Sequence, residues 1–200
     1  MIVIVDYKMG NLGSIKNMLK RIGSQSIISS DLDEIKNASK IILPGVGSFD
    51  RAIKNINEMG IREELENSTI KRKVPTLGIC LGMQIMTYGS EEGKLEGLKW
   101  IKGRCKKFIE KDLRIPHMGW NYTNVINENL LIKKNQDPSK FYFVHSYYVD
   151  LHSNKNIIFS TEYGKNFCSG FNVDNIYGVQ FHPEKSHKFG QNLLQNFIKI

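Results

Sequence analysis

Short apolar segments alternate with helical segments over residues 2–90, and this alternation constrains the fold more than any other feature. The run IVIVD at 2–6 is rich in β-branched residues and is typical of a strand buried on both faces. Residues 11–22 carry apolar side chains three and four positions apart, which predicts an amphipathic helix ending at Gly23. The pattern continues in strands expected at 24–29, 38–43 and 74–80 and in helices expected at 52–59 and from residue 82 onward. It indicates βαβ units and parallel strands with right-handed crossovers.

The second half of the chain has a different pattern. Short strand candidates separated by turn signals occupy 100–110, 141–150, 156–164, 167–173 and 175–183. They suggest antiparallel strands added to the same sheet, and a last amphipathic helix is expected at 189–198. No repeat or composition shift marks a boundary. We therefore expect a single α/β domain over residues 1–200, with a central mixed, mainly parallel sheet flanked by helices.

The composition excludes several classes of protein. The chain is 40% hydrophobic and 24% charged, which is typical of a globular protein, and no apolar stretch is long enough to span a membrane. The N-terminal segment has neither a basic region nor a cleavage site of the secretory type, so we expect a cytoplasmic protein. The three cysteines are an odd number without CxxC spacing, so neither a disulfide framework nor a metal site is expected.

The net charge of +8 raises the question of nucleic-acid binding. We discount it, because lysine outnumbers arginine by 22 to 6, and arginine is the residue favoured for bidentate recognition of phosphates and bases. The basic residues are also spread along the chain, with modest groups at 71–73 and 99–107. They indicate either a solvated surface or a basic patch for an acidic protein partner or a phosphorylated substrate.

The stretch GICLG at 78–82 places Cys80 between two glycines, at the end of an apolar strand and the start of a helix. This is the pattern of a nucleophile elbow, in which the flanking glycines leave room for a sharp turn. The N-terminal end of the helix would favour a thiolate there. A buried structural cysteine is the alternative interpretation of the motif on its own.

The stretch VQFHPE at 179–184 supplies the partners that such a nucleophile needs. His182 can accept the thiol proton, and Glu184 can hold the imidazole in the required tautomer. A third stretch, LPGVGSF at 43–49, is a glycine-rich turn directly after a strand. It exposes backbone N–H groups of the kind that form an oxyanion hole, although similar turns also bind phosphate or only connect elements.

Together these motifs resemble those of the class I, or triad, glutamine amidotransferases. GICLGMQ at 78–84 and HPE at 182–184 carry the resemblance. One branch, the glutaminase subunits of imidazole glycerol phosphate synthase, is also similar in DYKMGNLGSI (6–15), LPGVGSF (43–49), GSEEG (89–93), PHMGWN (116–121), FYFVHSYY (141–148) and GVQFHPEKS (178–186). The resemblance spans essentially the whole chain. It implies a flavodoxin-like sheet, no cofactor, and hydrolysis of L-glutamine through a thioester on the cysteine.

The resemblance also implies roles for individual residues. Cys80 would be the nucleophile, His182 the general base and acid, and Glu184 the group that orients the histidine. The residues expected to bind glutamine are Gln84, His145, Ser146 and Tyr147. Those expected to form the oxyanion site are Gly45, Val46, Gly47 and Leu81, the last through its backbone N–H. In the family, this strand is thought to need a peptide flip triggered by the partner, and the glycines beside Val46 make such a flip sterically easy.

The partner that the resemblance implies is a (βα)8-barrel cyclase or synthase subunit, in a heterodimer with this chain. The residues expected to contact it are Met9, Gly10, Asn11, Tyr142 and Lys185. Ammonia would travel through the barrel, because ammonia released into water near neutral pH would be largely protonated and no longer nucleophilic. We expect neither a nucleic acid nor a membrane as a partner.

Two stretches fit the histidine-pathway branch less well, NLGSIKNMLKRIG (11–23) and EKSHKFGQNLLQNF (184–197). Both resemble a paralogous branch whose ammonia is thought to convert an acetamido sugar to an acetamidino sugar for surface polysaccharide or flagellar glycans. The glutamine chemistry would be the same and the acceptor different. A non-catalytic module on the same fold is a further alternative, against which the presence of Cys80, His182, Glu184 and Gln84 argues.

The remaining conspicuous side chains have mainly structural interpretations. We expect packing roles for Trp100 and Trp120 and structural roles for Cys105 and Cys168. His117 lies either at the subunit interface or in the structural interior, and His187 is expected near the mouth of the site without a role.

Overall fold

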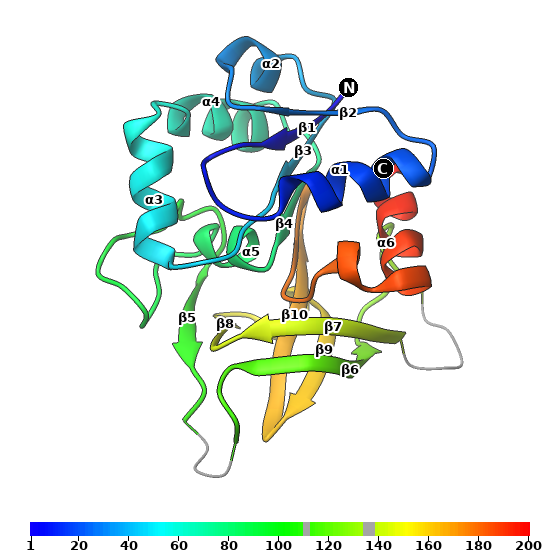
Figure 1. The fold of residues 1–200 in the computed structure, drawn as a ribbon. Helices are drawn as coiled ribbons and strands as arrows, with labels where there is room; N and C mark the ends of the chain where they lie inside the picture. Colours follow the sequence, from blue (N-terminus) through cyan, green and yellow to red (C-terminus); the bar gives the residue numbers. More distant parts are fainter. Residues whose placement is uncertain (110–112, 134–138) are drawn as a thin grey trace.

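The computed structural model describes residues 1–109, 113–133 and 139–200. Its strands form one eleven-stranded mixed sheet with helices packed on both sides, which confirms the predicted α/β fold (Figure 1). The sheet is not mainly parallel as expected, because within these ranges four of the pairings between its strands are parallel and six are antiparallel. The order of strands is β2-β1-β3-β4-β11-β10-β9-β6-β7, while β8 pairs with both β10 and β5.

Four strands from the N-terminal half and the last strand of the chain form the parallel part of this sheet. They are β1 (Ile2–Val5), β2 (Ser26–Ser29), β3 (Lys40–Leu43), β4 (Thr76–Ile79) and β11 (Ile176–Val179). The last strand was expected among the antiparallel ones, but it pairs in parallel with β4 and antiparallel only with β10. Every residue of β1, β4 and β11 is buried, as the continuous apolar runs predict. Alternate residues of β1 and β3 enter different cores, so the sheet separates two hydrophobic layers.

Helices cover the two faces of the parallel part. On one face lie α1 (Leu12–Arg21) and α6 (His187–Lys199), and on the other lie α2 (Leu32–Lys36), α3 (Phe49–Glu58) and α4 (Arg62–Glu66). A π-helical turn, η1 (Asn67–Lys71), continues α4, and two 3-10 turns are η2 (Asn154–Asn156) and η3 (Pro183–Lys185). No helix in the described ranges is long and apolar enough to cross a membrane.

The C-terminal strands form the antiparallel part. They are β5 (Gly103–Lys107), β6 (His117–Val125), β7 (Ser139–His145), β8 (Tyr147–Leu151), β9 (Ile157–Tyr163) and β10 (Lys165–Val173). β6 was not predicted from the sequence. The segment expected as one strand at 141–150 is two strands broken at Ser146. In the segment expected at 100–110, Glu110 lies outside the described residues.

The helix predicted from residue 82 is much shorter than its apolar sequence suggests. It is α5 (Leu81–Ile85), only five residues long. The carbonyl oxygens of Ile85 and Met86, which would continue the helix, accept N–H groups of Leu98 and Trp100 instead, at 2.8 and 2.9 Å. Tertiary hydrogen bonds therefore end the helix.

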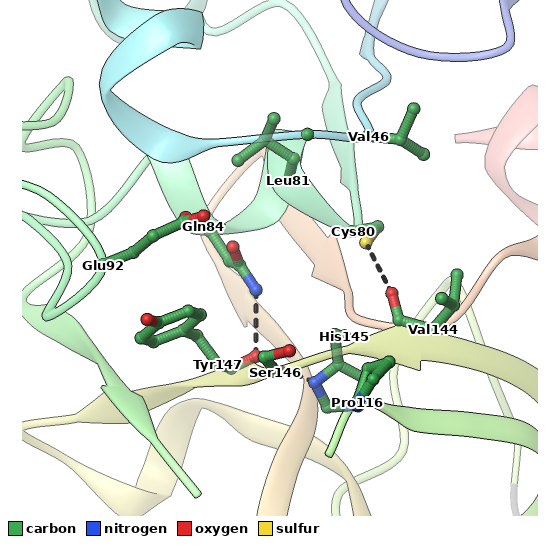
Figure 2. A pocket seen from close by; sticks show the side chains of 11 residues that line it. Val46, Cys80, Leu81, Gln84, Glu92, Pro116, Val144, His145, Ser146 and Tyr147 are labelled. Atoms are coloured by element: carbon green, nitrogen blue, oxygen red, sulfur yellow. Dashed lines mark hydrogen bonds between the residues drawn. The ribbon is translucent and has the colours of Figure 1, made fainter.

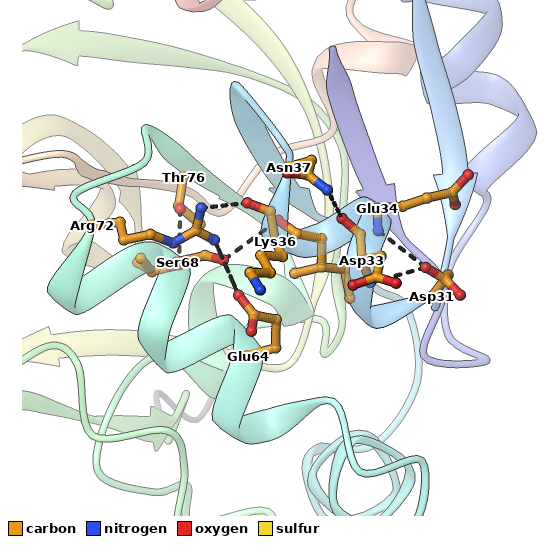
Figure 3. A network of polar contacts seen from close by, with 11 residues as sticks. Asp31, Asp33, Glu34, Lys36, Asn37, Glu64, Ser68, Arg72 and Thr76 are labelled. Atoms are coloured by element: carbon orange, nitrogen blue, oxygen red, sulfur yellow. Dashed lines mark hydrogen bonds and ion pairs between the residues drawn. The ribbon is translucent and has the colours of Figure 1, made fainter.

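A polar network fixes α2 against α4 and η1, three elements that the sequence analysis did not predict (Figure 3). Arg72 donates to the carbonyl oxygen of Lys36 and to the carboxylate of Glu64, the latter at 3.0 Å. Ser68 donates to the same carboxylate at 2.9 Å. These bonds lie at the amino end of the parallel strands, so they stabilise the scaffold without entering the site described next.

Candidate active site

The predicted catalytic residues meet at one edge of the parallel sheet. Cys80 follows β4, His182 lies three residues beyond β11, and Gly45 lies two residues beyond β3. These strands are parallel neighbours, so their carboxyl ends lie side by side. The topology thus brings together three motifs that are far apart in the sequence.

The elbow at Cys80 has the strained geometry that its two glycines predict. Cys80 has φ 53° and ψ −108°, a conformation unusual for a residue with a side chain. A Cβ atom on Gly82 would lie 1.8 Å from the carbonyl oxygen of Leu43, and one on Gly78 would lie 2.7 Å from that of Gly82. Only glycine fits at either position, because Gly82 lies directly against β3 and Gly78 lies directly against the backbone of α5.

His182 and Glu184 form a buried pair beside this elbow. Nδ1 of His182 lies 2.8 Å from Oε1 of Glu184, and both side chains are almost completely buried. Burial lowers the pKa of His182, but the adjacent Cys80 thiol and Glu184 carboxylate together raise it above the ordinary value. Glu184 thus holds Nδ1 of the imidazole beside the cysteine.

A pocket of about 240 Å³ opens in front of the cysteine (Figure 2). It contains all four residues predicted to bind glutamine, and its lining is Val46, Gly47, Cys80, Leu81, Gln84, Glu92, Pro116, Val144, His145, Ser146 and Tyr147. The break between β7 and β8 at Ser146 turns the 144–147 segment into its wall. Gln84 donates its side-chain amide to the carbonyl oxygen of Tyr147 at 3.0 Å, which connects α5 to that wall.

The predicted oxyanion residues are close to the cysteine, but their donors do not all face the pocket. Val46, Gly47 and Leu81 line it. The N–H of Leu81 donates to the carbonyl oxygen of Gly45 at 3.4 Å. The N–H group that an oxyanion would need is therefore already bound to a carbonyl oxygen, and the oxyanion hole is not formed in this conformation.

The predicted partner loop at 9–11 packs directly against this turn. A Cβ on Gly10 would lie 3.1 Å from Cα of Gly45, and one on Gly47 would lie 2.7 Å from Cε of Met9. Asn11 accepts the N–H of Ser14 at 3.3 Å and so caps α1. A displacement of this loop would therefore press on the 45–47 turn.

Tyr142 and Lys185, the other two residues predicted at the interface, lie close to each other on β7 and η3. Nζ of Lys185, on η3, lies 5.5 Å from the centre of the Tyr142 ring, on β7. The indole of Trp120 lies 6.1 Å from the same ring and stacks on His187 at 5.3 Å. Trp120 is 41% exposed, so it lies on an open face rather than in the packed position expected for it.

Several residues of the site were not assigned from the sequence. Glu92 belongs to the GSEEG stretch and places a carboxylate at the pocket, where it accepts the N–H of Phe49 at 3.0 Å. Gln180 belongs to the VQFHPE stretch, and its side-chain amide lies 3.6 Å from the sulfur of Cys80. Both positions were in recognised motifs, but nothing in their spacing indicated where the side chains point.

His117 is an interior residue rather than an interface residue. Its Nδ1 lies 3.0 Å from Nε2 of His145, and its ring stacks on Tyr163. Burial lowers the pKa of His117 to about 4 and that of His145 to about 3. Both imidazoles are therefore neutral near pH 7, and they support the pocket wall from behind.

The two other cysteines have the structural environments expected of them. Burial raises the pKa of both Cys105 and Cys168 to about 12, so neither thiol ionises near neutral pH. Trp100 packs against the core, as expected. Within the described ranges, no group of three or more His, Cys, Asp or Glu side chains has a metal-binding arrangement.

Comparison with known proteins agrees with this geometry. Residues 3–200 match the family model described as glutamine amidotransferase class-I. The chain is 52% identical to "Imidazole glycerol phosphate synthase subunit HisH 2" of Methanococcus maripaludis, over 100% of this chain and 99% of that protein. It is 45% identical to "Imidazole glycerol phosphate synthase subunit HisH" of Leptospira borgpetersenii, over the full length of both.

Among solved structures, the fold is similar to that of PurLQS from Thermotoga maritima, with a TM-score of 0.76 and 18% identity over 99% of this chain and 97% of that one. The similarity at this level concerns the fold alone, whereas the family match and the two relatives cover the chain from end to end. The chain therefore belongs to the class-I glutamine amidotransferases, enzymes to which the imidazole glycerol phosphate synthase HisH subunits also belong.

Proposed function

We propose that this protein is the glutaminase subunit of imidazole glycerol phosphate synthase, which hydrolyses L-glutamine and passes the ammonia to a cyclase subunit. The observation that carries the proposal is the strained Cys80 between a glutamine-sized pocket and the buried His182–Glu184 pair. The identity of 52% with a full-length relative of that name supports the choice of pathway.

In the proposed reaction, Sγ of Cys80 attacks the side-chain carbonyl carbon of glutamine while His182 accepts the thiol proton. The C–N bond then breaks, and His182 returns the proton to the departing ammonia. Water adds to the resulting thioester, releases glutamate and restores the thiol. Glu184 keeps Nδ1 of the imidazole protonated, so that Nε2 faces the sulfur.

The pocket wall supplies groups that match the rest of the substrate. Backbone and side-chain groups of His145, Ser146 and Tyr147 are available for the α-amino and α-carboxylate ends, together with Gln84. The carboxylate of Glu92 is the natural partner for an α-ammonium group.

We further propose that the partner activates the enzyme by rearranging the 45–47 turn. The N–H of Leu81 becomes available to an oxyanion only when the carbonyl oxygen of Gly45 moves away from it. The 9–11 loop packs on this turn, so a partner that binds there can drive the change. The proposed partner is a (βα)8-barrel subunit that also contacts Tyr142 and Lys185 and shields the ammonia from water.

Substitution of the nucleophile tests the proposal. In the complex with the cyclase encoded by the same organism, Cys80→Ala should abolish glutamine-dependent synthesis, with a loss of at least about 10³-fold. Synthesis from added ammonium should persist. Cys105→Ala is the matched control, because that thiol lies in the core, and it should retain both activities. Glutamine-dependent synthesis by Cys80→Ala would contradict the proposal.

A second candidate acceptor is favoured by one specific observation. The stretches at 11–23 and 184–197 resemble the paralogous branch more than the histidine-pathway branch. The alternative function is to feed ammonia to a synthase that forms acetamidino sugars. Co-purification distinguishes the two, since a chain that binds the sugar synthase and fails to bind the histidine-pathway cyclase belongs to the second pathway.

A further inference from the structure

The side chain of Gln180 is completely buried next to the reacting sulfur, and the reaction described above does not use it. Gln180 lies directly after β11, and its backbone N–H donates to the carbonyl oxygen of Ser169 at 2.9 Å. Its side-chain Nε2 lies 3.6 Å from Sγ of Cys80, and its Oε1 lies 3.1 Å from Nε2 of Gln84. A buried amide with both ends engaged in this way holds a single orientation.

The orientation of the Gln180 amide follows from the carbonyl group of Tyr147, at which this series of hydrogen bonds ends. The carbonyl oxygen of Tyr147 can only accept, so Gln84 must present its NH₂ group to it. The same NH₂ group then donates its second hydrogen to Oε1 of Gln180. Nε2 of Gln180 is consequently turned toward Cys80, and it points an N–H group at the sulfur.

We propose that Gln180 is a positioning residue that donates a hydrogen bond to the sulfur of Cys80 and stabilises its thiolate. The proposal rests on the proposed function only in taking Cys80 as the nucleophile. A donor to an ionised acceptor forms a stronger hydrogen bond than a donor to a neutral one, so the N–H group of Gln180 favours ionisation of the thiol.

The surroundings of the sulfur explain why such a donor is useful. The thiol of Cys80 donates to the carbonyl oxygen of Val144 at 3.8 Å, and this acceptor favours the neutral thiol. His182 also lies beside the sulfur, and its protonated form favours the thiolate, so the amide of Gln180 acts in the same direction as His182. The amide of Gln180 opposes the effect of the Val144 carbonyl, and the Gln84–Tyr147 contact keeps the amide in place.

The test is the pH dependence of alkylation of Cys80 by iodoacetamide, followed by mass spectrometry on the full-length protein. Gln180→Met keeps a similar volume but removes the donor. We expect it to raise the pH midpoint of Cys80 alkylation by about one pH unit, which means about tenfold less thiolate at a given pH below the midpoint. Gln180→Glu places carboxyl oxygens against the sulfur and should raise the midpoint at least as far. Thiolate absorbance, measured as the difference from Cys80→Ala, gives the same midpoint if alkylation is slow.

Ser169→Ala is the matched control. Ser169 is buried in the same sheet and accepts the hydroxyl of Thr161 at 2.8 Å. Its loss should reduce stability without moving the midpoint. Midpoints within about 0.3 pH units of the wild type in both folded Gln180 variants would overturn the proposal and reduce Gln180 to a packing role. That outcome is independent of the proposed glutaminase chemistry, which fails if Cys80→Ala retains glutamine-dependent synthesis.

Discussion

The parallel and antiparallel parts of the sheet are built from different kinds of strand. In the parallel part, β1, β4 and β11 are buried along their whole length, because helices cover both faces. In the antiparallel part, β6 and β7 alternate between buried and more exposed residues. One face of β6 carries Met118, Trp120 and Tyr122, which are 63%, 41% and 57% exposed. The parallel part is thus a scaffold closed on both faces, and the antiparallel part leaves aromatic side chains accessible.

The candidate active site lies where the two parts meet. The parallel part contributes Cys80 at the end of β4, and the antiparallel part contributes the wall at 144–147. His182 follows β11, the strand that pairs with β4 on one side and with β10 on the other. The rigid part therefore positions the nucleophile, and the part with the open face borders the substrate.

The largest expected effect tests how closely the parallel part is packed at the elbow. In Gly82→Ala, the new Cβ would meet the carbonyl oxygen of Leu43 at 1.8 Å, and no side-chain rotation relieves a backbone contact. We expect the free energy of unfolding to fall by about 4 kcal/mol or more. Chemical denaturation measures this. Gly13→Ala in α1 has nothing within 4 Å of its Cβ and should be neutral or stabilising.

The next prediction compares the loss of stability at a residue buried in the parallel part with the loss at an exposed residue. Ile42 in β3 is fully buried, and Ile42→Ala should lower the free energy of unfolding by about 3 kcal/mol, because it removes apolar contacts and leaves a cavity. Leu130→Ala, in a residue that is 72% exposed, should change it by less than about 0.5 kcal/mol. Equal losses in urea denaturation would contradict the distinction.

An effect that is smaller for each pH unit concerns the buried histidines of the antiparallel part. Burial lowers the pKa of His117 to about 4 and that of His145 to about 3, whereas both have the ordinary value in the unfolded chain. Below about pH 6.5 the unfolded state therefore binds more protons, and the free energy of unfolding falls as the pH drops toward 4. The expected slope is up to about 1.4 kcal/mol per pH unit for each histidine.

The variant His117→Phe isolates one of these two contributions. A phenyl ring preserves stacking on Phe143 and Tyr163 but cannot be protonated. Denaturation at several pH values between about 4.5 and 6.5 should show about half of the wild-type slope. An unchanged slope would mean that other groups cause the acid sensitivity.

The smallest expected effect concerns the exposed face of β6. Tyr122 is 57% exposed, and its ring contacts the ammonium group of Lys140 at 5.2 Å. Tyr122→Ala should lower the free energy of unfolding by no more than about 0.5 kcal/mol, because the side chain contributes little to the core. A loss above about 1.5 kcal/mol in thermal or urea denaturation would show that this face supports the sheet.

Much of the fold and the catalytic constellation could be predicted from local patterns. The apolar runs at 2–6 and 74–80 predicted buried strands, and the structure has strands at 2–5 and 76–79. The glycines around Cys80 predicted a sharp turn. By contrast, β6 was missed because its exposed face is aromatic and its pattern does not alternate clearly between polar and apolar. The short length of α5 was also missed, because hydrogen bonds from 98–101 end it, and these residues are distant in the sequence.

The sequence by itself indicated that Cys80 and the 45–47 turn follow strands of one parallel sheet, and the motifs indicated that His182 acts with them. The parallel pairing of β11 with β4, which brings His182 to the same edge of the sheet, was decided only by the tertiary structure, because the strand before His182 was expected to be antiparallel. Only the tertiary structure decided which side chain faces the sulfur of Cys80 and which group binds the N–H of Leu81. The amide of Gln180 points at Cys80 because a series of hydrogen bonds from Tyr147 fixes its orientation. The N–H of Leu81 is bound to the carbonyl oxygen of Gly45 because the elbow and the 45–47 turn pack together. Strands follow from local periodicity, whereas the direction of a buried amide depends on partners that only the folded chain brings within reach.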